Sequence, residues 1–537
     1  MRRIWRAILL VATTHDGNTP MTTLDDIYHT MRAGNFAHAE QLCRSLLNRE
    51  PSNVEALRIL AGIANHHGHF AQGLEILQRA VSLRPDFAPA LLDLGTSYAR
   101  MNQLDQSERT LSSLTELQAD NANAWFFLGN TQRQQRKFSH ALRSYLEAVD
   151  CSPDSAPAHN NVADMYRELH HYDDALKHYN IALGIRPDLI EAFNGRGVLY
   201  AIMGDYPQAA ADYTSALALD STNTITHFNR AFLLLHQGNY EEGWREYEKR
   251  PALTQTEAIR GFRQPRWRGE NIQGKTILLH PEQGFGDTLQ FCRYTKMVAE
   301  RGARVIAFVQ PHLKTLLMGL DGAHRLVTRD EPLPDFDVHC TYLSLPGIFQ
   351  TRQNTIPAQE RYIQAPLDRV AQWKQRIGDK RRPRVGIVWS GSANHSSDHN
   401  RTLTLEYFLT AITGDVELFS LQNELRTGDE NTLEKSSVIH FGAELGDFAD
   451  TAALIEQMDL VITVDTSIAH LAASLGVPTW TLILHYPDWR WQREGDQTAW
   501  YPTMRLFRQQ QPGNWDHELG EIRDALATWL GTMRSTH

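Results

Sequence analysis

The sequence predicts an α + α/β protein, in which an N-terminal α-solenoid of repeats is followed by an α/β region made of two Rossmann-like halves. The first observation is a motif that recurs every 34 residues through the first half of the chain. The second is a change at about residue 275, after which short apolar runs alternate with helical segments. The length of 537 residues agrees with this organisation, because it is about three to four times the usual domain size.

The repeats are marked by a turn signal. Gly34-Asn35-Phe36 and Gly68-His69-Phe70 are the first two of seven such tripeptides, which recur without a register slip between about residues 20 and 257. A small residue lies three positions after the hydrophobic member of each tripeptide. Proline and glycine also recur, where a second helix must stop or where two helices must approach closely. These positions are Pro51, Pro85, Pro153, Pro187, Gly95, Gly129 and Gly197.

This pattern resembles tetratricopeptide repeats. The resemblance implies paired antiparallel helices that stack into a superhelix with a concave groove, and such arrays bind peptides or proteins. Asparagines on the first helix of several repeats are candidates for clamping the backbone of an acceptor peptide, because each side chain both donates and accepts hydrogen bonds. The alternative is that they are ordinary solvated residues of a helix face. The candidate groove residues are Asn160, Asn161, Asn194, Asn229 and Arg230.

The second part of the chain has the pattern of two parallel sheets. Strand-like runs alternate with helical stretches, and the connections are too long for hairpins. A charged segment with prolines, near 356–384, divides the region into halves of similar size. The expected strands are 276–280, 305–309, 385–389, 417–421, 460–464 and 479–484. The expected divisions are a weakly ordered segment 1–19, repeats 20–257, a linker 258–274, a first half 275–360, a linker 361–383, a second half 384–515, and a C-terminal helix and tail 516–537.

Three polar loops follow strands in this region, and each is a candidate for chemistry. In the first loop, Gly284 and Gly286 let the backbone approach a ligand just before a helix begins. Asp287, at the end of this loop, could accept the proton of a hydroxyl group, since a carboxylate is ionised at neutral pH. A helix N-cap is an equally good interpretation of Asp287 from these residues alone.

The second and third loops offer groups that bind phosphate. The second, 389–401, is polar and long enough to close over a ligand. Arg401 at its end could hold a phosphate with two hydrogen bonds, although an ordinary surface arginine is the alternative. In the third loop, 465–470, Thr466 and Ser467 add hydroxyls to the backbone amides of a helix start. This pattern suits a diphosphate, but it is also that of a plain helix cap.

Four stretches of the C-terminal region read EQGFGDTLQFCRY, VGIVWSGS, LGDFADTAALIEQMDLVITVDTSIAHLAASLGVP and DWRW…WYPTMRLFRQ. Together they resemble the bacterial heptosyltransferase-like proteins of glycosyltransferase family 9, and in particular its relatives with N-terminal tetratricopeptide repeats. The resemblance covers about residues 262–530. It implies a GT-B fold and an inverting transfer from a nucleotide-sugar, with no obligatory metal and no other cofactor.

The resemblance also implies roles for single residues. Asp287 matches the acidic residue that acts as general base toward the acceptor hydroxyl. Arg401 falls where the family has a phosphate-binding Lys, and Ser467 falls where it usually has Gly. Either Gln422 or Glu424 is expected to take the place of a nucleotide-contacting Glu. The expected nucleotide-sugar site is Gly284, Gly286, Ser390, Arg401, Gln422, Glu424, Asp465, Thr466, Ser467 and His470.

Two further motifs have competing interpretations. Asp335-Phe336-Asp337 spells the D-x-D triplet of metal-dependent glycosyltransferases, but it lies away from the three loops in the sequence, which favours a structural role. A group of aromatic residues could stack on a base or a sugar ring, or could pack between domains. These residues are Trp489, Trp491, Trp500 and Tyr501.

Composition and charge restrict the partners. A formal charge of −10 argues against a generic nucleic-acid coat, and no apolar run approaches the roughly 20 residues that span a bilayer. The four separated cysteines suit a reducing cytoplasm and form no metal-binding pair. The N-terminal stretch MRRIWRAILLVA is a weak signal peptide, or it precedes the real start at Met21. We therefore expect a cytoplasmic protein with no nucleic-acid partner and no integral membrane segment.

The leading functional prediction is a glycosyltransferase whose repeats capture a protein and deliver its Ser or Thr hydroxyl to the site, with flagellin or another bacterial protein as acceptor. This prediction rests on analogy with other repeat-bearing transferases. A scaffold that binds nucleotide-sugar weakly or not at all is a second interpretation. A transferase that acts on a lipid-linked glycan is a third, although no basic amphipathic surface helix supports it.

Overall fold

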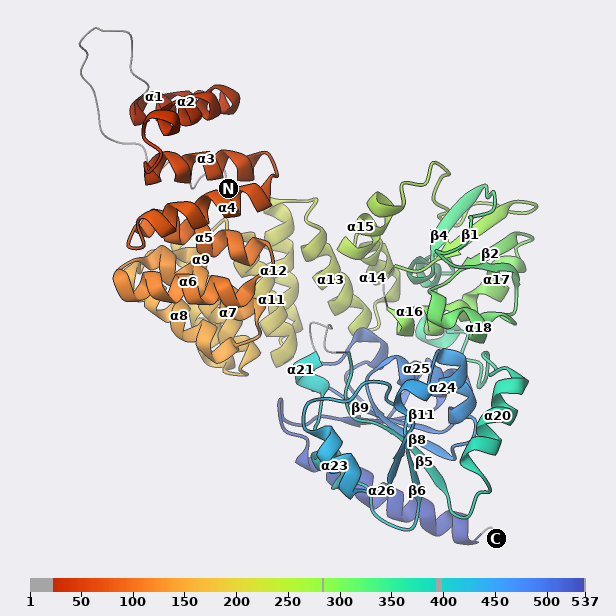
Figure 1. The fold of residues 1–537 in the computed structure, drawn as a ribbon. Helices are drawn as coiled ribbons and strands as arrows, with labels where there is room; N and C mark the ends of the chain where they lie inside the picture. The colour runs from red at the N-terminus through yellow and green to blue at the C-terminus, as the bar shows by residue number, and fades with distance from the viewer. Residues whose placement is uncertain (1–22, 283, 393–397, 536–537) are drawn as a thin grey trace. The chain divides into compact units, whose positions relative to one another are not determined.

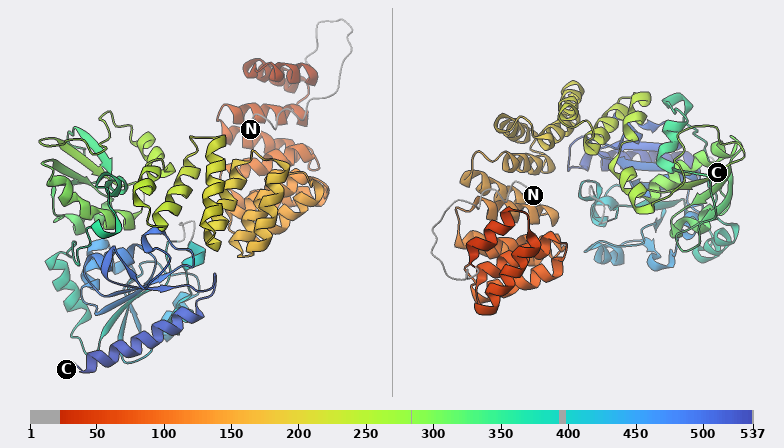
Figure 2. Two further views of the ribbon diagram at one scale, coloured as in Figure 1. Left: turned by 180° about the vertical axis from the view of Figure 1, so that it is seen from behind. Right: turned by 90° about the horizontal axis from the view of Figure 1, so that it is seen from above.

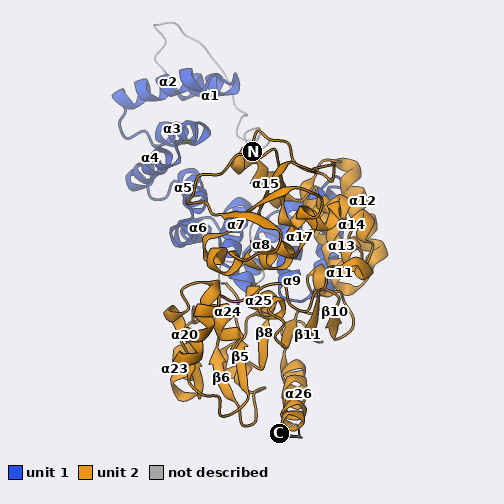
Figure 3. Cartoon of the chain, turned by 90° about the vertical axis from the view of Figure 1, so that its right-hand side faces the viewer, with its two compact units in different colours: residues 1–192 blue, residues 193–537 orange. Residues whose placement is uncertain are grey.

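The computed structural model describes residues 23–282, 284–392 and 398–535 (Figure 1, with further views in Figure 2). The segment 1–19, which we expected to be weakly ordered, lies outside them. The chain divides into two compact units, residues 1–192 and residues 193–537 (Figure 3). The described part of the first unit is built of helices, whereas the second unit joins further helices to two β-sheets.

The first unit is the α-solenoid that the period of 34 residues predicts. Each turn inside a helix pair carries one residue with positive φ, and these are Gly34, Gly68, Asn102, Arg136 and His170. Glycine and asparagine reach this conformation most easily, which explains the turn signal of the repeat. The helices are α1 (Leu24–Arg32), α2 (Phe36–Arg49), α3 (Val54–His66), α4 (Phe70–Leu83), α5 (Ala88–Arg100), α6 (Leu104–Leu117), α7 (Ala122–Gln134), α8 (Phe138–Cys151), α9 (Ala156–Glu168) and α10 (Tyr172–Ile185).

The recurring prolines and glycines lie where the period predicts. Pro51 and Pro85 each follow the end of a second helix by two residues, since α2 ends at Arg49 and α4 at Leu83. A Cβ atom on Gly129 would lie 2.6 Å from the ring of Tyr145, so glycine allows α7 and α8 to approach closely. The repeat signal therefore reports real packing constraints and not only composition.

The same repeat continues into the second unit. α11 (Ile190–Met203), which begins just before the boundary, is followed by α12 (Tyr206–Leu219), α13 (Thr224–His236) and α14 (Tyr240–Tyr247). A further helix, α15 (Pro251–Arg260), leads from the last repeat into the α/β region. It overlaps the beginning of the segment that we expected to be a linker.

Two sheets follow, as expected for two Rossmann-like halves of a GT-B fold. Their strand orders are β3-β2-β1-β4 and β10-β11-β9-β8-β5-β6-β7, and all pairs are parallel except β10 with β11. The first sheet contains β1 (Thr276–His280), β2 (Arg304–Phe308), β3 (Ala323–Val327) and β4 (Val338–Thr341). The second contains β5 (Arg384–Val388), β6 (Glu417–Ser420), β7 (Val438–His440), β8 (Leu460–Val464), β9 (Thr479–Ile483), β10 (Gln497–Thr498) and β11 (Tyr501–Arg508).

Helices cover both faces of the second sheet (Figure 2). One core joins α20, α24 and α25 to Phe419 and Val461, and the other joins α22 and α26 to Leu418 and Ile462. In the part of the chain that is described, no helix combines the length and the apolar composition needed to cross a membrane. The helices of this region are α16 (Phe285–Phe291), α17 (Thr295–Ala299), α18 (Lys314–Leu317), α19 (Leu345–Ile348), α20 (Leu367–Ile377), α21 (Asp398–Arg401), α22 (Leu405–Leu409), α23 (Asp429–Lys435), α24 (Phe448–Ile455), α25 (Ser467–Ser474) and α26 (Asp516–Ser535).

The last repeat is part of the core of the α/β region. Trp244 of α14 donates a hydrogen bond from its indole nitrogen to the backbone oxygen of Thr351, at 2.8 Å. The same ring meets the ring of Trp489 edge to face, with 5.1 Å between centroids, and Tyr247 contacts Trp489 as well. All three aromatic side chains are buried in one continuous core with the first sheet. The seventh repeat is therefore not a detachable module.

A buried ion pair fixes the end of the repeats to the loop that follows β1. The side chains of Arg250 and Glu282 are 1% and 0% exposed, and the guanidinium binds both carboxylate oxygens. Arg250 also donates to the backbone oxygen of Tyr247 at 2.8 Å and to the hydroxyls of Thr341 and Ser344, each at 3.1 Å. Such a pair offsets its cost of desolvation only when the remaining hydrogen-bonding groups are satisfied, as they are around this guanidinium.

We predict that Glu282→Gln destabilises the second unit by about 3–5 kcal/mol, because it removes the buried counter-charge of Arg250 and leaves only the partly exposed Glu248. Urea unfolding followed by tryptophan fluorescence measures this loss. Glu248→Gln is the matched control, since Glu248 also contacts Arg250, at 3.1 Å, but its side chain is 30% exposed. That control should cost less than about 1 kcal/mol. Equal losses in the two variants would show that the buried pair is not the decisive contact.

Candidate active site

Three strand ends carry the candidate site, and they come from both sheets. The loop after β1 and the loop after β8 are in direct contact, because a Cβ atom on Gly286 would lie 2.8 Å from the ring of His470 and 3.6 Å from Cα of Ser467. α16 accordingly packs against α25 (Figure 1). Glycine at position 286 is thus explained by the close approach of another chain segment. The sequence predicts that the two halves face one another across these strand ends, whereas the contact of Gly286 with His470 is seen only in the structure.

Asp287 lies in the first turn of α16, and its carboxylate is held by an arginine from the second half. Its Oδ1 accepts a hydrogen bond from Nη2 of Arg490 at 2.6 Å, and its side chain is 31% exposed. Gly284 occupies the N-cap of α16, so the interpretation of Asp287 as that cap is wrong. Burial raises the pKa of Asp287, and the positive charge of Arg490 opposes this rise.

Arg490 was not identified from the sequence, although it lies in the DWRW stretch. It belongs to a 3₁₀ turn, η7 (Trp489–Trp491), and its side chain is only 8% exposed. Besides Asp287 it binds Oδ1 of Asp488 through Nη1 at 2.9 Å and Oε1 of Gln290 through Nε at 2.5 Å. A charge inside an aromatic run was the only sequence signal that could have indicated it.

Arg401, at the end of the second loop, binds the third loop. Its Nη1 donates to the backbone oxygen of Asp465 at 2.5 Å, and its Nε lies 3.6 Å from Asp398. The side chain is mostly buried, so the interpretation as an ordinary surface arginine is wrong. Asp398 is also paired with Arg426, which donates to the backbone oxygen of Gly391 at 2.6 Å. Residues 393–397 of the predicted closing loop lie outside the described part of the chain.

Gln422 holds the beginning of the second loop through hydrogen bonds. Its Oε1 accepts from the backbone nitrogens of Trp389 and Ser390, each at 2.9 Å, and its Nε2 donates to Ser390 Oγ at 2.8 Å and to the backbone oxygen of Glu424 at 2.9 Å. Both ends of this buried amide are therefore engaged within the protein. Glu424, the other candidate for a nucleotide contact, is exposed beside it.

The third loop combines a helix start with a half-buried carboxylate. Thr466 is the N-cap of α25, and its hydroxyl accepts from the backbone nitrogen of Ile468 at 3.3 Å. Ser467, the first residue of the helix, is half-buried. Asp465 accepts a hydrogen bond from the indole of Trp491 at 2.8 Å, and burial raises its pKa to about 6. The helix cap predicted for this loop is therefore present. The other backbone amides of the first turn have no partner within the helix and can bind an anion.

His470 lies on the same helix as a buried, neutral side chain. Its Nδ1 is 2.8 Å from the hydroxyl of Tyr501, and its ring stacks on Trp491 with 5.3 Å between centroids. Burial holds the pKa of His470 well below its ordinary value, and nearby arginines act in the same direction. The imidazole is therefore suited to polar contact as a neutral group and not as a cation.

The two ambiguous motifs have structural roles. Trp489 and Trp500 are buried in the main core, as the packing interpretation requires. In the D-x-D triplet, Asp337 accepts from the backbone nitrogen of Thr276 at 2.7 Å. Thr276 begins β1, so this contact lies at the opposite end of the strand from the loop that carries Asp287.

The asparagines of the repeats are mostly buried. Asn160 donates to Asn161 at 3.3 Å, and Asn161 donates to Asn130 at the same distance, so these two are not solvated face residues. Asn194, in the second unit, donates to Thr226 at 2.9 Å. The Oδ1 atoms of Asn160 and Asn194 are buried, and neither has a hydrogen-bond partner among the described residues. Asn229 is half-buried, and Arg230 is paired with Glu242 at 2.8 Å.

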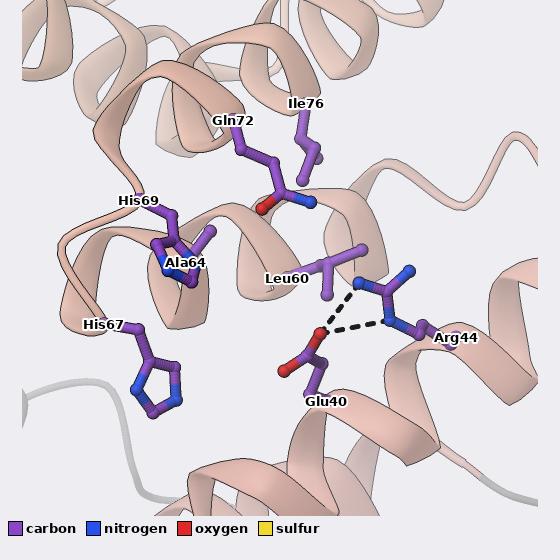
Figure 4. Close-up of a pocket in the computed structure, with 8 residues that line it drawn as sticks. All are labelled: Glu40, Arg44, Leu60, Ala64, His67, His69, Gln72 and Ile76. Carbon is purple, nitrogen blue, oxygen red and sulfur yellow. Dashed lines mark hydrogen bonds and ion pairs between the residues drawn. The ribbon is translucent and has the colours of Figure 1, made fainter.

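A separate cavity of about 230 Å³ lies within the first unit (Figure 4). It is bounded by α2, α3 and α4, and its polar lining includes His67, His69 and the ion pair of Glu40 with Arg44. Across the described ranges, no group of three or more acidic, histidine or cysteine side chains is arranged to hold a metal ion. This cavity therefore does not have the donor set of a metal centre.

Both the repeats and the α/β region contain segments that match known protein families. Tetratricopeptide repeat models match residues 28–87, 64–128, 144–177 and 190–223. The model of glycosyltransferase family 9 (heptosyltransferase) matches residues 445–492, which include the third loop and Arg490. These matches confirm the resemblance inferred from the sequence.

Protein FlbA of Caulobacter vibrioides is 25% identical over 295 residues, which are 49% of this chain and 48% of FlbA. The chain thus spans about half the length of this curated relative. Among solved structures, a tetratricopeptide repeat protein from Parabacteroides merdae is 18% identical, with a TM-score of 0.39, over 44% of this chain and 94% of that one. PilF of Pseudomonas aeruginosa is 16% identical, with a TM-score of 0.36, over 38% and 94% of the two chains.

We predict that wild-type protein binds nucleoside-diphosphate sugars more tightly as the pH falls from 8 to 5. Below its pKa of about 6, Asp465 is neutral and does not repel an anion at the start of α25. Asp465→Asn should lose this dependence and should bind at pH 8 up to about tenfold more tightly than wild type. Calorimetry at three pH values measures both effects. Weaker binding by the variant at every pH would show instead that the ionised carboxylate contacts the ligand.

Proposed function

We propose that this chain, which joins tetratricopeptide repeats to a glycosyltransferase family 9 region, transfers a sugar from a nucleotide-sugar to a hydroxyl group of a protein held by the repeats. The observation that carries the proposal is the convergence of three strand-end loops. Asp287 of the first half is bound to Arg490 of the second half at 2.6 Å, beside the contact of Gly286 with His470. A carboxylate thus lies next to a helix start and to arginines, as glycosyl transfer requires.

The proposed reaction is a single inverting displacement. The acceptor oxygen forms a bond to the anomeric carbon while the bond from that carbon to the diphosphate breaks, and Asp287 accepts the hydroxyl proton. The leaving diphosphate carries negative charge, which the backbone amides at the start of α25 and the guanidinium of Arg401 are suited to stabilise. We propose that these groups take the part that a metal ion plays in other glycosyltransferases. Thr466 and Ser467 add hydroxyls at the same helix start.

The repeats support a protein acceptor. The family models place the repeats along most of the first unit, and repeats of this kind bind proteins. The Oδ1 atoms of Asn160 and Asn194 are buried and have no partner among the described residues, so each would accept a hydrogen bond from a peptide backbone only after neighbouring side chains move. We therefore propose a Ser or Thr hydroxyl in an extended segment as the acceptor.

We predict that Asp287→Asn lowers sugar transfer by about 10²–10⁴-fold, because the acceptor loses its general base, and leaves donor affinity within about twofold. The donor is first chosen from a thermal-shift panel of nucleotide-sugars, and transfer of its radiolabelled sugar to proteins of a cell extract is then measured. Asp335→Asn is the control, since Asp335 is an exposed carboxylate of the same half and should be dispensable. Full activity of the Asp287 variant would exclude it as the base.

We predict that the fragment 187–537, which lacks most of the first unit, still hydrolyses the donor but transfers at least about tenfold less sugar to protein, because multivalent capture is lost. The fragment 258–537 should instead be insoluble, since it removes Trp244, Tyr247 and Arg250 from the core. Labelled-sugar transfer and donor hydrolysis are measured in parallel. Undiminished protein transfer by the first fragment would show that the deleted repeats do not hold the acceptor.

A further inference from the structure

The turn η7 is held in place by contacts that do not depend on the guanidinium of Arg490. Trp489 is buried against Trp244 and Tyr247 of the last repeat, and also against Trp500, with 5.9 Å between the two indole centroids. Asp488 caps the turn, because its carboxylate accepts from the backbone nitrogen of Arg490 at 3.0 Å. The backbone position of Arg490 is therefore set by the packing of Trp489 and by the Asp488 cap.

The guanidinium of Arg490 is then oriented by three acceptors. Asp287, Asp488 and Gln290 each take a different nitrogen, at 2.6, 2.9 and 2.5 Å. The guanidinium carbon also lies over the ring of Phe291, 5.2 Å from its centroid, which adds a cation–π contact. A lysine has one nitrogen and no planar fork, so it cannot satisfy this arrangement. These contacts fix the guanidinium, and with it the Nη2 atom that binds Asp287.

We infer that Arg490 is a positioning residue for Asp287, whose carboxylate it fixes in one orientation and whose negative charge it balances among the other acids of the site. The catalytic part of this inference rests on the proposed role of Asp287 as general base. Arg490 itself has no assigned contact with substrate, and it acts through the carboxylate that it holds.

The charges around Asp287 explain why it needs this partner. Asp488 and Glu282 are the nearby carboxylates, and both disfavour a further negative charge, while Arg490 and Arg250 favour it. Arg250 is already committed to Glu282 by two hydrogen bonds. The hydroxyl of Tyr247 faces the same region and stays neutral, because burial raises its pKa. Arg490 is therefore the positive charge that directly offsets the burial of Asp287.

The inference is tested on the full chain without knowledge of the substrate. A water-soluble carbodiimide reacts with protonated carboxyl groups, and peptide mapping by mass spectrometry gives the pH midpoint of labelling at Asp287. Arg490→Gln should raise this midpoint by about one pH unit or more, because the attractive charge is lost. Asp488→Asn should lower it, because a repulsive charge is lost while the capping oxygen remains. Arg490→Lys should give a smaller rise, and it serves if the glutamine variant does not fold.

Arg493→Gln is the matched control, since Arg493 lies in the same loop but binds the hydroxyl of Tyr206 at 3.0 Å and not Asp287. Its labelling midpoint should equal that of wild type. The inference is overturned if the midpoint is unchanged in folded Arg490→Gln or Arg490→Lys protein, or if Arg493→Gln shifts it equally. The labelling result does not depend on catalysis. If the Asp287→Asn variant is active, Asp287 is not the general base, but the labelling experiment still decides whether Arg490 positions its carboxylate.

The inference also predicts a shift in the acidic side of the pH–activity profile of sugar transfer. Transfer requires ionised Asp287, so activity falls as the pH drops through the pKa of Asp287. In Arg490→Gln this fall should begin at a pH about one unit higher than in wild type, in line with the labelling midpoint. If the variant has a lower maximal activity but its activity falls at the same pH as in wild type, the substitution has only damaged the structure, and the inference is contradicted.

Discussion

The buried pair of Arg250 and Glu282 is the contact on which the rest of the second unit depends. Arg250 follows the last repeat helix, and Glu282 begins the loop that ends at Asp287. Two charges removed from water must keep each other and all their hydrogen bonds, so the distance between these chain segments is not free to vary. The hydroxyls of Thr341 and Ser344 complete the shell from β4 and the turn after it. The pair thus fixes the end of the last repeat, β4 and the loop after β1 relative to one another.

A second constraint comes from aromatic packing, and it brings the other half of the site to Asp287. Trp244 and Trp489 meet in the core, and the next residue after Trp489 is the arginine that binds Asp287. Trp491, one residue further, binds Asp465 and stacks on His470. A three-residue turn therefore connects the last repeat to both site carboxylates. Stacking on a sugar ring was one interpretation of these aromatic residues, but in the structure they pack in the core and position polar groups.

Features set by local sequence were predictable, and long-range pairings were not. The period of 34 residues predicts the solenoid because each turn needs a residue tolerant of positive φ, as at Gly34. Central strands such as β5 and β8 are buried on both faces and show as apolar runs. β3 contains His324 and Arg325 and lies at a sheet edge, so it gave no such signal. The partner of Asp287 lies 203 residues away, and no local pattern indicates a contact of that separation.

The central claim is that the repeats and the family 9 region together modify protein hydroxyls with a sugar. Its most direct test is intact-protein and peptide mass spectrometry of cells with and without this chain, complemented by the Asp287→Asn variant. We predict that a defined set of proteins carries a sugar mass on Ser or Thr, and that this mass is absent both without the chain and with the variant. Unchanged protein masses, together with an altered glycan of a lipid carrier, would contradict the account.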